Sequence, residues 1–245
     1  MDEFYGGLPP VGHCDGTVRG LKEMGRKAGI DHFIVHSVAT KPEQVKSINA
    51  FISEAVQSSG GMFTGLGAMH PLSQTLEEDF AHLLELGLKG VKIHPDFQKF
   101  HVDDEKAFRI YELCEKNNVP VLVHTGDYRY DYSNPERVVN VLKTFPHLKF
   151  IGAHLGGWSV WERAKALLWG YPNLYVDTSS SAYWLNAHQM IEMIRAYGAE
   201  HVMFGSDYPM WHADTELAIL RRLGLTQEEY DQICLKTCAD LYHIK

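Results

Sequence analysis

Seven short apolar runs, each about the length of one β-strand, alternate with amphipathic stretches along the 245 residues. Each run ends at a histidine or an aspartate, and these residues are His36, His70, His94, His124, His154, Asp177 and Asp207. Successive ends are 34, 24, 30, 30, 23 and 30 residues apart, about the length of one βα unit. Strand, helix and strand in this order predict a parallel sheet with right-handed crossovers. The sequence therefore predicts an α/β fold, a single (β/α)8 TIM-barrel-like domain over 1–245 with seven recognisable strands.

The stretches between the runs have the period of helices. Residues 17–29, 76–87, 104–117 and 135–145 each place their apolar side chains on one face, as surface helices do. Gly29 is expected to end the first of them and Asp103 to begin the third. The last stretch, 226–244, is expected to form one closing helix, with Thr226 as its N-cap and Glu229 completing a capping box.

Composition excludes several classes of partner. The net charge is −8 and no basic block occurs, so nucleic acid and anionic membrane surfaces are not expected as partners. The longest apolar runs fall far short of the ~20 residues of a membrane span, and the N-terminus does not have the pattern of a secretory signal. Four cysteines without a CxxC pair favour a reducing, cytoplasmic setting.

The strand ends suggest a site. Histidine is 14 of 245 residues but closes five of the seven runs. In a βα barrel all these ends converge on one face, where active sites are built. Imidazoles and carboxylates together suit a divalent metal, zinc above all and manganese as the alternative, and also acid–base chemistry on a small-molecule substrate. His36 and His70 are better explained as core histidines bonded to a carbonyl, and Asp177 is equally well explained as a cap through Thr178 and Ser179.

Three strand-end motifs carry a family resemblance. "VLVHTG" (His124), "IGAHLGGW" (His154) and "MFGSDYP" (Asp207), in this order, resemble the amidohydrolase superfamily, and most closely its aminocarboxymuconate-semialdehyde decarboxylase-like branch. "GLKGVKIHPDFQ" and "LAILRRL" are similar to that branch as well, so the resemblance runs from about Gly12 to the C-terminus. It implies that His124 binds metal and that His154 binds a second metal or orients water or substrate. It also implies that Asp207 binds metal and accepts the proton of the attacking water.

One part of the family pattern is missing. The family's first strand carries a His-x-His pair of metal ligands, and this sequence has none. Candidate substitutes for the pair are "GHCDG" (His13, Cys14, Asp15), recruitment of His70 or His94, and a carboxylated Lys92. A natural start upstream of Met1 is a further explanation.

Other residues are expected to shape the pocket. His70, His94, Arg129 and Trp158 are candidate substrate-binding residues, Arg129 as a bidentate clamp for a carboxylate. Trp161 and Trp169 are expected to pack a helix or a subunit interface, which would make the protein a homo-oligomer.

The function expected first is a metal-dependent hydrolase in which metal-activated water attacks a small carbonyl substrate, Asp207 moves the proton and His154 stabilises the oxyanion. One alternative is a non-oxidative decarboxylase of a small, aromatic carboxylic acid. The other is a catalytically silent or truncated barrel that serves as a binding or assembly protein.

Overall fold

The computed structural model describes residues 14–244, and these contain a curved sheet of seven parallel strands in the order β1-β2-β3-β4-β5-β6-β7. Each strand pairs with the next one along the chain, which confirms the predicted α/β barrel-like topology. Most strands are only two to four residues long. Six of the seven predicted histidines and aspartates lie within two residues of a strand end, and Asp207 lies four residues beyond β7. The strands are β1 (Phe33–Val35), β2 (Phe63–Ala68), β3 (Gly90–Ile93), β4 (Val121–Val123), β5 (Phe150–Gly152), β6 (Leu174–Asp177) and β7 (Val202–Met203).

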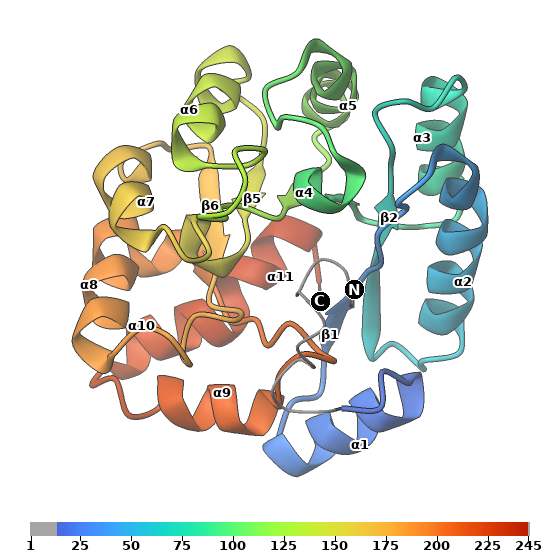
Figure 1. Cartoon of the computed structure of the whole chain (residues 1–245). Coiled ribbons are helices and arrows are strands. Elements are labelled where there is room, and N and C mark those ends of the chain that lie inside the picture. The colour runs from blue at the N-terminus through green and yellow to red at the C-terminus, as the bar shows by residue number, and fades with distance from the viewer. Residues whose placement is uncertain (1–13, 245) are drawn as a thin grey trace.

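Helices connect the strands and lie around the outside of the curved sheet (Figure 1). The helices before β6 are α1 (Val18–Ala28), α2 (Val45–Gln57), α3 (Leu76–Glu85), α4 (Pro95–Gln98), α5 (Glu105–Lys116), α6 (Pro135–Thr144) and α7 (Trp161–Leu168). Those after it are α8 (Ala187–Tyr197), α9 (Ala213–Leu220), α10 (Gln227–Asp231) and α11 (Thr237–Tyr242). Short 3₁₀ turns cover Pro42–Gln44, His154–Gly156 and Ala199–His201. No helix among the described residues is long and apolar enough to cross a membrane.

The helix ends test the predicted caps. Gly29 closes α1 in the left-handed conformation, and Thr226 caps α10 in a full capping box with Glu229. One expectation was wrong. Asp104 rather than Asp103 stands at the N-cap of α5, because the Asp103 carboxylate instead accepts hydrogen bonds from α6. The closing helix is present as one continuous helical stretch, in which a π-helical segment, Gln232–Lys236, joins α10 to α11.

Apolar side chains pack on both faces of the sheet. The larger cluster lies between the sheet and the outer helices and includes Ile93, Val121 and Phe150. A smaller cluster lies inside the curve of the sheet, where Leu122 and Ile151 meet Tyr242 of α11. Successive residues of a strand point to opposite faces, so adjacent residues such as Val121 and Leu122 enter different clusters. Helix α11 thus fills part of the barrel interior.

The sheet does not close on itself. No described residue pairs β7 with β1, and the two strands remain at opposite ends of the sheet order. The amide of Phe204, just after β7, instead donates to the carbonyl of Ile233 in the π-helical segment. Helices α1 and α9 lie side by side below the gap in Figure 1, where the Ala213 amide contacts the Met24 sulfur at 3.3 Å. The gap between the edge strands is therefore bordered by helices and not by an eighth strand of the described chain.

Candidate active site

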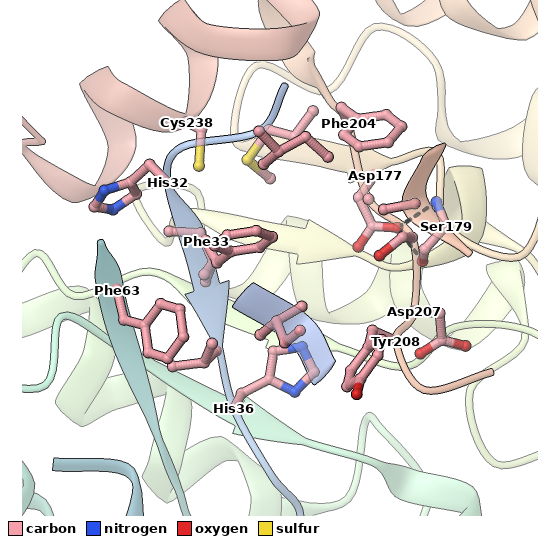
Figure 2. A pocket seen from close by; sticks show the side chains of 18 of the residues that line it. His32, Phe33, His36, Phe63, Asp177, Ser179, Phe204, Asp207, Tyr208 and Cys238 are labelled. Atoms are coloured by element: carbon pink, nitrogen blue, oxygen red, sulfur yellow. Dashed lines mark hydrogen bonds between the residues drawn. The ribbon is translucent and has the colours of Figure 1, made fainter. Parts of the chain in front are cut away.

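A cavity of about 700 Å³ lies between β1 and β7, within the size range of ligand pockets. Apolar residues of both edge strands line it, among them Phe33 and Val35 of β1, Met203 of β7, and Phe204, which follows β7. Figure 2 shows His32 and Cys238 at one end of this space and His36, Asp207 and Tyr208 at the other. The polar residues that line it at the carboxyl ends of the strands are His36, Lys92, His154, Asp177, Ser179 and Asp207. Four predicted strand-end residues are therefore brought to one cavity.

Lys92 is the buried cation of this cavity. Its side chain points from β3 into the curve of the sheet, and the residue is only 6% exposed. Burial lowers the pKa of Lys92, while the negative charges of Asp177 and Asp207 act in the opposite direction. A buried ammonium group is costly unless a counter-charge faces it, and Asp177 and Asp207 supply negative charge beside Lys92.

Asp177 is both a cap and a cavity residue. One of its carboxylate oxygens accepts hydrogen bonds from the amides of His154 at 3.1 Å and Ser179 at 3.0 Å, and from the Ser179 hydroxyl. The His154 Nδ1 in turn lies 3.0 Å from the Ser179 carbonyl oxygen. His154 has a φ of +60°, a region that non-glycine residues adopt at a cost. The loop thus holds the His154 ring in one orientation.

Asp207 stands four residues beyond the end of β7, at a φ of +56°. Its carboxylate accepts a hydrogen bond of 2.7 Å from the Ser180 hydroxyl, whose oxygen accepts one of 2.8 Å from the Trp211 indole. This chain of contacts fixes the carboxylate beside Tyr208 at the polar end of the cavity (Figure 2).

His124 contacts His154 but belongs to a second cluster as well. The His124 Nδ1 lies 3.1 Å from the His154 Nε2. In the part of the chain that the structure describes, the group of three side chains placed to hold a metal ion is His94, Asp96 and His124, with ligand atoms within 4.8 Å of one another. This group shares only His124 with the set implied by the family motifs.

The expected substrate-binding residues lie elsewhere. Arg129 makes a bidentate ion pair with the fully buried Asp127, at 2.9 and 2.7 Å, and its guanidinium lies 5.5 Å from the Trp158 ring. The His70 Nδ1 accepts the Leu72 amide at 3.2 Å. Among the described residues that line the cavity, none is His70, His94, Arg129 or Trp158. Their roles toward substrate remain predictions.

The substitutes for the missing pair are also placed. His13 lies outside the described residues. Cys14 donates from its thiol to the Trp211 carbonyl at 3.6 Å, and Asp15 accepts the Tyr208 hydroxyl at 2.6 Å. These contacts tie the start of the described chain to the loop after Asp207.

Sequence reasoning missed three buried polar residues. Asp96 follows His94 and Pro95 directly after β3, so its position near a strand end could have marked it as a site residue. It lies in the short helix α4 and not at the strand end itself. Ser180 lies in the run of serines after Asp177, where the pattern indicated only a cap. Glu216 lies within α9, is 2% exposed, and nothing in the sequence distinguishes it from a surface glutamate.

Comparisons with known proteins identify the family. Residues 15–244 match the family described as Amidohydrolase. The chain therefore belongs to the amidohydrolase family, a family of enzymes.

Individual relatives support the same placement. A 2-amino-3-carboxymuconate-6-semialdehyde decarboxylase from Dictyostelium discoideum is 33% identical over 79 residues, which are 31% of this chain and 22% of that relative. An uncharacterized TIM-barrel protein from Bordetella bronchiseptica has a TM-score of 0.80 at 22% identity, covering 92% of this chain and 82% of that one. A dihydroxybenzoic acid decarboxylase from Polaromonas, solved with manganese and the inhibitor 2-nitroresorcinol, has a TM-score of 0.72 at 17% identity, covering 99% and 92%. At these identities the two structures show the fold alone.

Proposed function

We propose that this protein is a metal-dependent, non-oxidative decarboxylase of a small aromatic carboxylic acid. The observation that carries the proposal is the buried Lys92, which lines a cavity with many apolar side chains in its walls. The decarboxylase activities named for the Dictyostelium and Polaromonas proteins support it. These activities favour decarboxylation over hydrolysis. The strand-end motifs alone had favoured hydrolysis.

The cavity offers the parts that this reaction needs. In decarboxylation the carbon–carboxylate bond breaks, carbon dioxide leaves, and the carbon that held it takes up a proton. Lys92 would bind and orient the anionic substrate by charge. The apolar side chains of Val35, Met203 and Phe204 would hold the body of the substrate and exclude water. Asp207 would hold and move the proton at its carboxylate, which Ser180 keeps in position.

A divalent metal ion fits a residue beside the cavity, His124, whose ring contacts the cavity residue His154. The His124 Nε2 is buried and has no hydrogen-bond partner among the described residues, as a ligand nitrogen requires. The family motifs propose His124, His154 and Asp207 as the ligand set. A bound ion would act as a Lewis acid on a substrate oxygen. Zinc remains a candidate, and the manganese in the Polaromonas relative favours manganese.

The test is a panel of hydroxybenzoic and related aromatic acids with purified protein supplied with manganese or zinc. Release of carbon dioxide and loss of substrate absorbance would be followed together, and a parallel panel of esters, amides and lactones would detect hydrolysis. We expect carbon dioxide release from at least one acid. Turnover confined to the hydrolysis panel would support the hydrolase instead, and turnover of neither would support a silent barrel.

Lys92→Met is the matching variant. It removes the charge and keeps the volume, so carbon dioxide release should fall by ~10²-fold or more. Melting temperature should stay level or rise, because a buried ammonium group is lost. Lys89→Met, an exposed position three residues earlier, is the control and should retain activity. Equal activity in both variants would contradict the role of Lys92.

A further inference from the structure

The hydrogen bonds around His154 determine which nitrogens of two histidines carry protons. The Ser179 carbonyl oxygen can only accept, and the Ser179 hydroxyl, 2.9 Å from the His154 Nδ1, donates its proton to Asp177. The Nδ1 therefore donates to the Ser179 carbonyl at 3.0 Å. The Nε2 of a neutral His154 is then an acceptor. The His124 Nδ1, 3.1 Å from that atom, is therefore the donor of their hydrogen bond. It follows that the His124 Nε2 carries a lone pair and no proton.

This lone pair faces a carboxylate. The Asp96 Oδ2 lies 3.8 Å from the His124 Nε2 and accepts a hydrogen bond of 2.7 Å from the Ser133 hydroxyl. At 3.8 Å the two atoms are too far apart to share a proton in a hydrogen bond. The other oxygen of Asp96 and the His124 Nε2 are both buried without a hydrogen-bond partner in the described chain. Two buried electron-pair donors that face each other are unfavourable unless a cation lies between them.

His94 completes the cluster. Its ring stacks on that of His124, with centroids 3.9 Å apart and an interplanar angle of 7°. One of its nitrogens lies within 4.8 Å of the ligand atoms of the other two residues. All three side chains are at least nine-tenths buried. Two imidazole nitrogens and one carboxylate oxygen are ligands that suit zinc or manganese.

We propose that Asp96, His124 and His94 bind the divalent cation, so that Asp96 and not Asp207 supplies the carboxylate ligand. The inference rests on the metal dependence of the proposed function and changes the ligand set. His154 and Ser133 act as positioning residues, because they orient His124 and Asp96 through the hydrogen bonds described above. Asp207 is then free of metal ligation and available for proton transfer at the cavity.

Metal binding itself tests the site. Untagged protein, freed of metal by dialysis against a chelator and then against buffer, would be titrated with manganese and, separately, zinc. Bound metal per chain would be measured by elemental analysis, and free manganese by electron paramagnetic resonance. Asp96→Asn keeps the shape of the side chain and its contact with Ser133, so the variant should fold. Asp207→Asn tests the rival ligand, and Asp131→Asn, an exposed carboxylate, is the control.

We expect about one ion per chain in the wild type, Asp207→Asn and Asp131→Asn, with affinity at least ~10-fold weaker in Asp96→Asn. Unchanged affinity in Asp96→Asn, or loss of binding in Asp207→Asn alone, would overturn the proposed site. No binding to the wild type above background would overturn it together with the metal dependence. Since binding is measured without turnover, failure of the decarboxylase panel alone would count against the proposed function and leave this site standing.

Discussion

The loops that follow His124 and His154 approach each other closely at Gly126. The effect of a substitution at this contact on stability can be estimated from the structure. Gly126 has a φ of +80°, and a Cβ built on it would lie 2.6 Å from two backbone atoms of Gly157 and 2.7 Å from the amide nitrogen of Trp158. The Trp158 amide donates to the Thr125 carbonyl at 2.8 Å. An alanine at 126 must therefore separate two backbones that a hydrogen bond holds together.

The loss of stability in Gly126→Ala has two parts, the left-handed backbone and the steric clash. A second glycine, Gly170, allows the first part to be measured alone. Gly170 has nearly the same φ, +83°, and open space around its would-be Cβ. Gly170→Ala should pay only for the left-handed backbone, about 1–2 kcal/mol. Gly126→Ala should lose this and about 1–3 kcal/mol more for the forced separation. In a chain of this size each kcal/mol lowers the melting temperature by roughly 2–4 °C.

The assay is thermal or urea unfolding of the two variants beside the wild type. Gly126→Ala should be clearly less stable than Gly170→Ala, and its metal affinity should fall because the His124 loop shifts. Equal losses of stability would refute the close approach of the two loops. A normal metal affinity in a destabilised Gly126→Ala would refute the link between this contact and the cation site.

Two further predictions concern buried carboxyl groups. Burial raises the pKa of Glu216 to about 8 from an ordinary 4.5, so the folded state holds that proton more tightly than the unfolded state. The contribution of this group to the free energy of unfolding is complete below pH 4.5 and is lost as the pH rises toward 8, by up to a few kcal/mol. In urea titrations across this pH range, Glu216→Gln should lose less stability with rising pH than the wild type. Parallel curves of stability against pH for the two proteins would contradict the prediction. Arg129→Ala leaves the buried carboxylate of Asp127 without its guanidinium partner and should cost about 1–3 kcal/mol. Arg109→Ala, which breaks a largely exposed pair with Glu77, should cost under ~1 kcal/mol, and equal losses would argue against a structural role for Arg129.

The order of elements and the strand ends were readable in the sequence because both depend on local pattern. A short apolar run closed by histidine or aspartate marks the end of a parallel strand, and parallel strands carry their ends to one face. Of the seven residues grouped in this way, His36, His154, Asp177 and Asp207 line one cavity, and His70, His94 and His124 are not among its lining residues. It also placed Thr226 at a helix start, since a capping box is complete within four residues.

What the sequence did not show depends on partners distant in the chain. The ring of His154 is set by Ser179, 25 residues later, and Asp96 by Ser133, 37 residues later. No period or motif connects such pairs. Arg129 was also not predictable, although its partner Asp127 is only two residues away. Whether this arginine pairs with Asp127 or contacts a ligand depends on the burial of the Asp127 carboxylate. Burial follows from the fold and cannot be read from either residue alone.

The open side of the sheet explains why a ligand can reach these residues. All three residues of β1 are half-buried, whereas every residue of β3, β4 and β5 is buried. An unpaired edge ordinarily has to be covered, and here the cavity borders the edges of β1 and β7 while helices enclose its outer side. Apolar side chains line much of the space, Lys92 lies with Asp177 and Asp207 at the carboxyl ends of the strands, and Asp31 and Arg221 line it elsewhere. A small molecule that suits both parts has a carboxylate at one end and a flat apolar body behind it, which is why an aromatic acid is the substrate class we would test first.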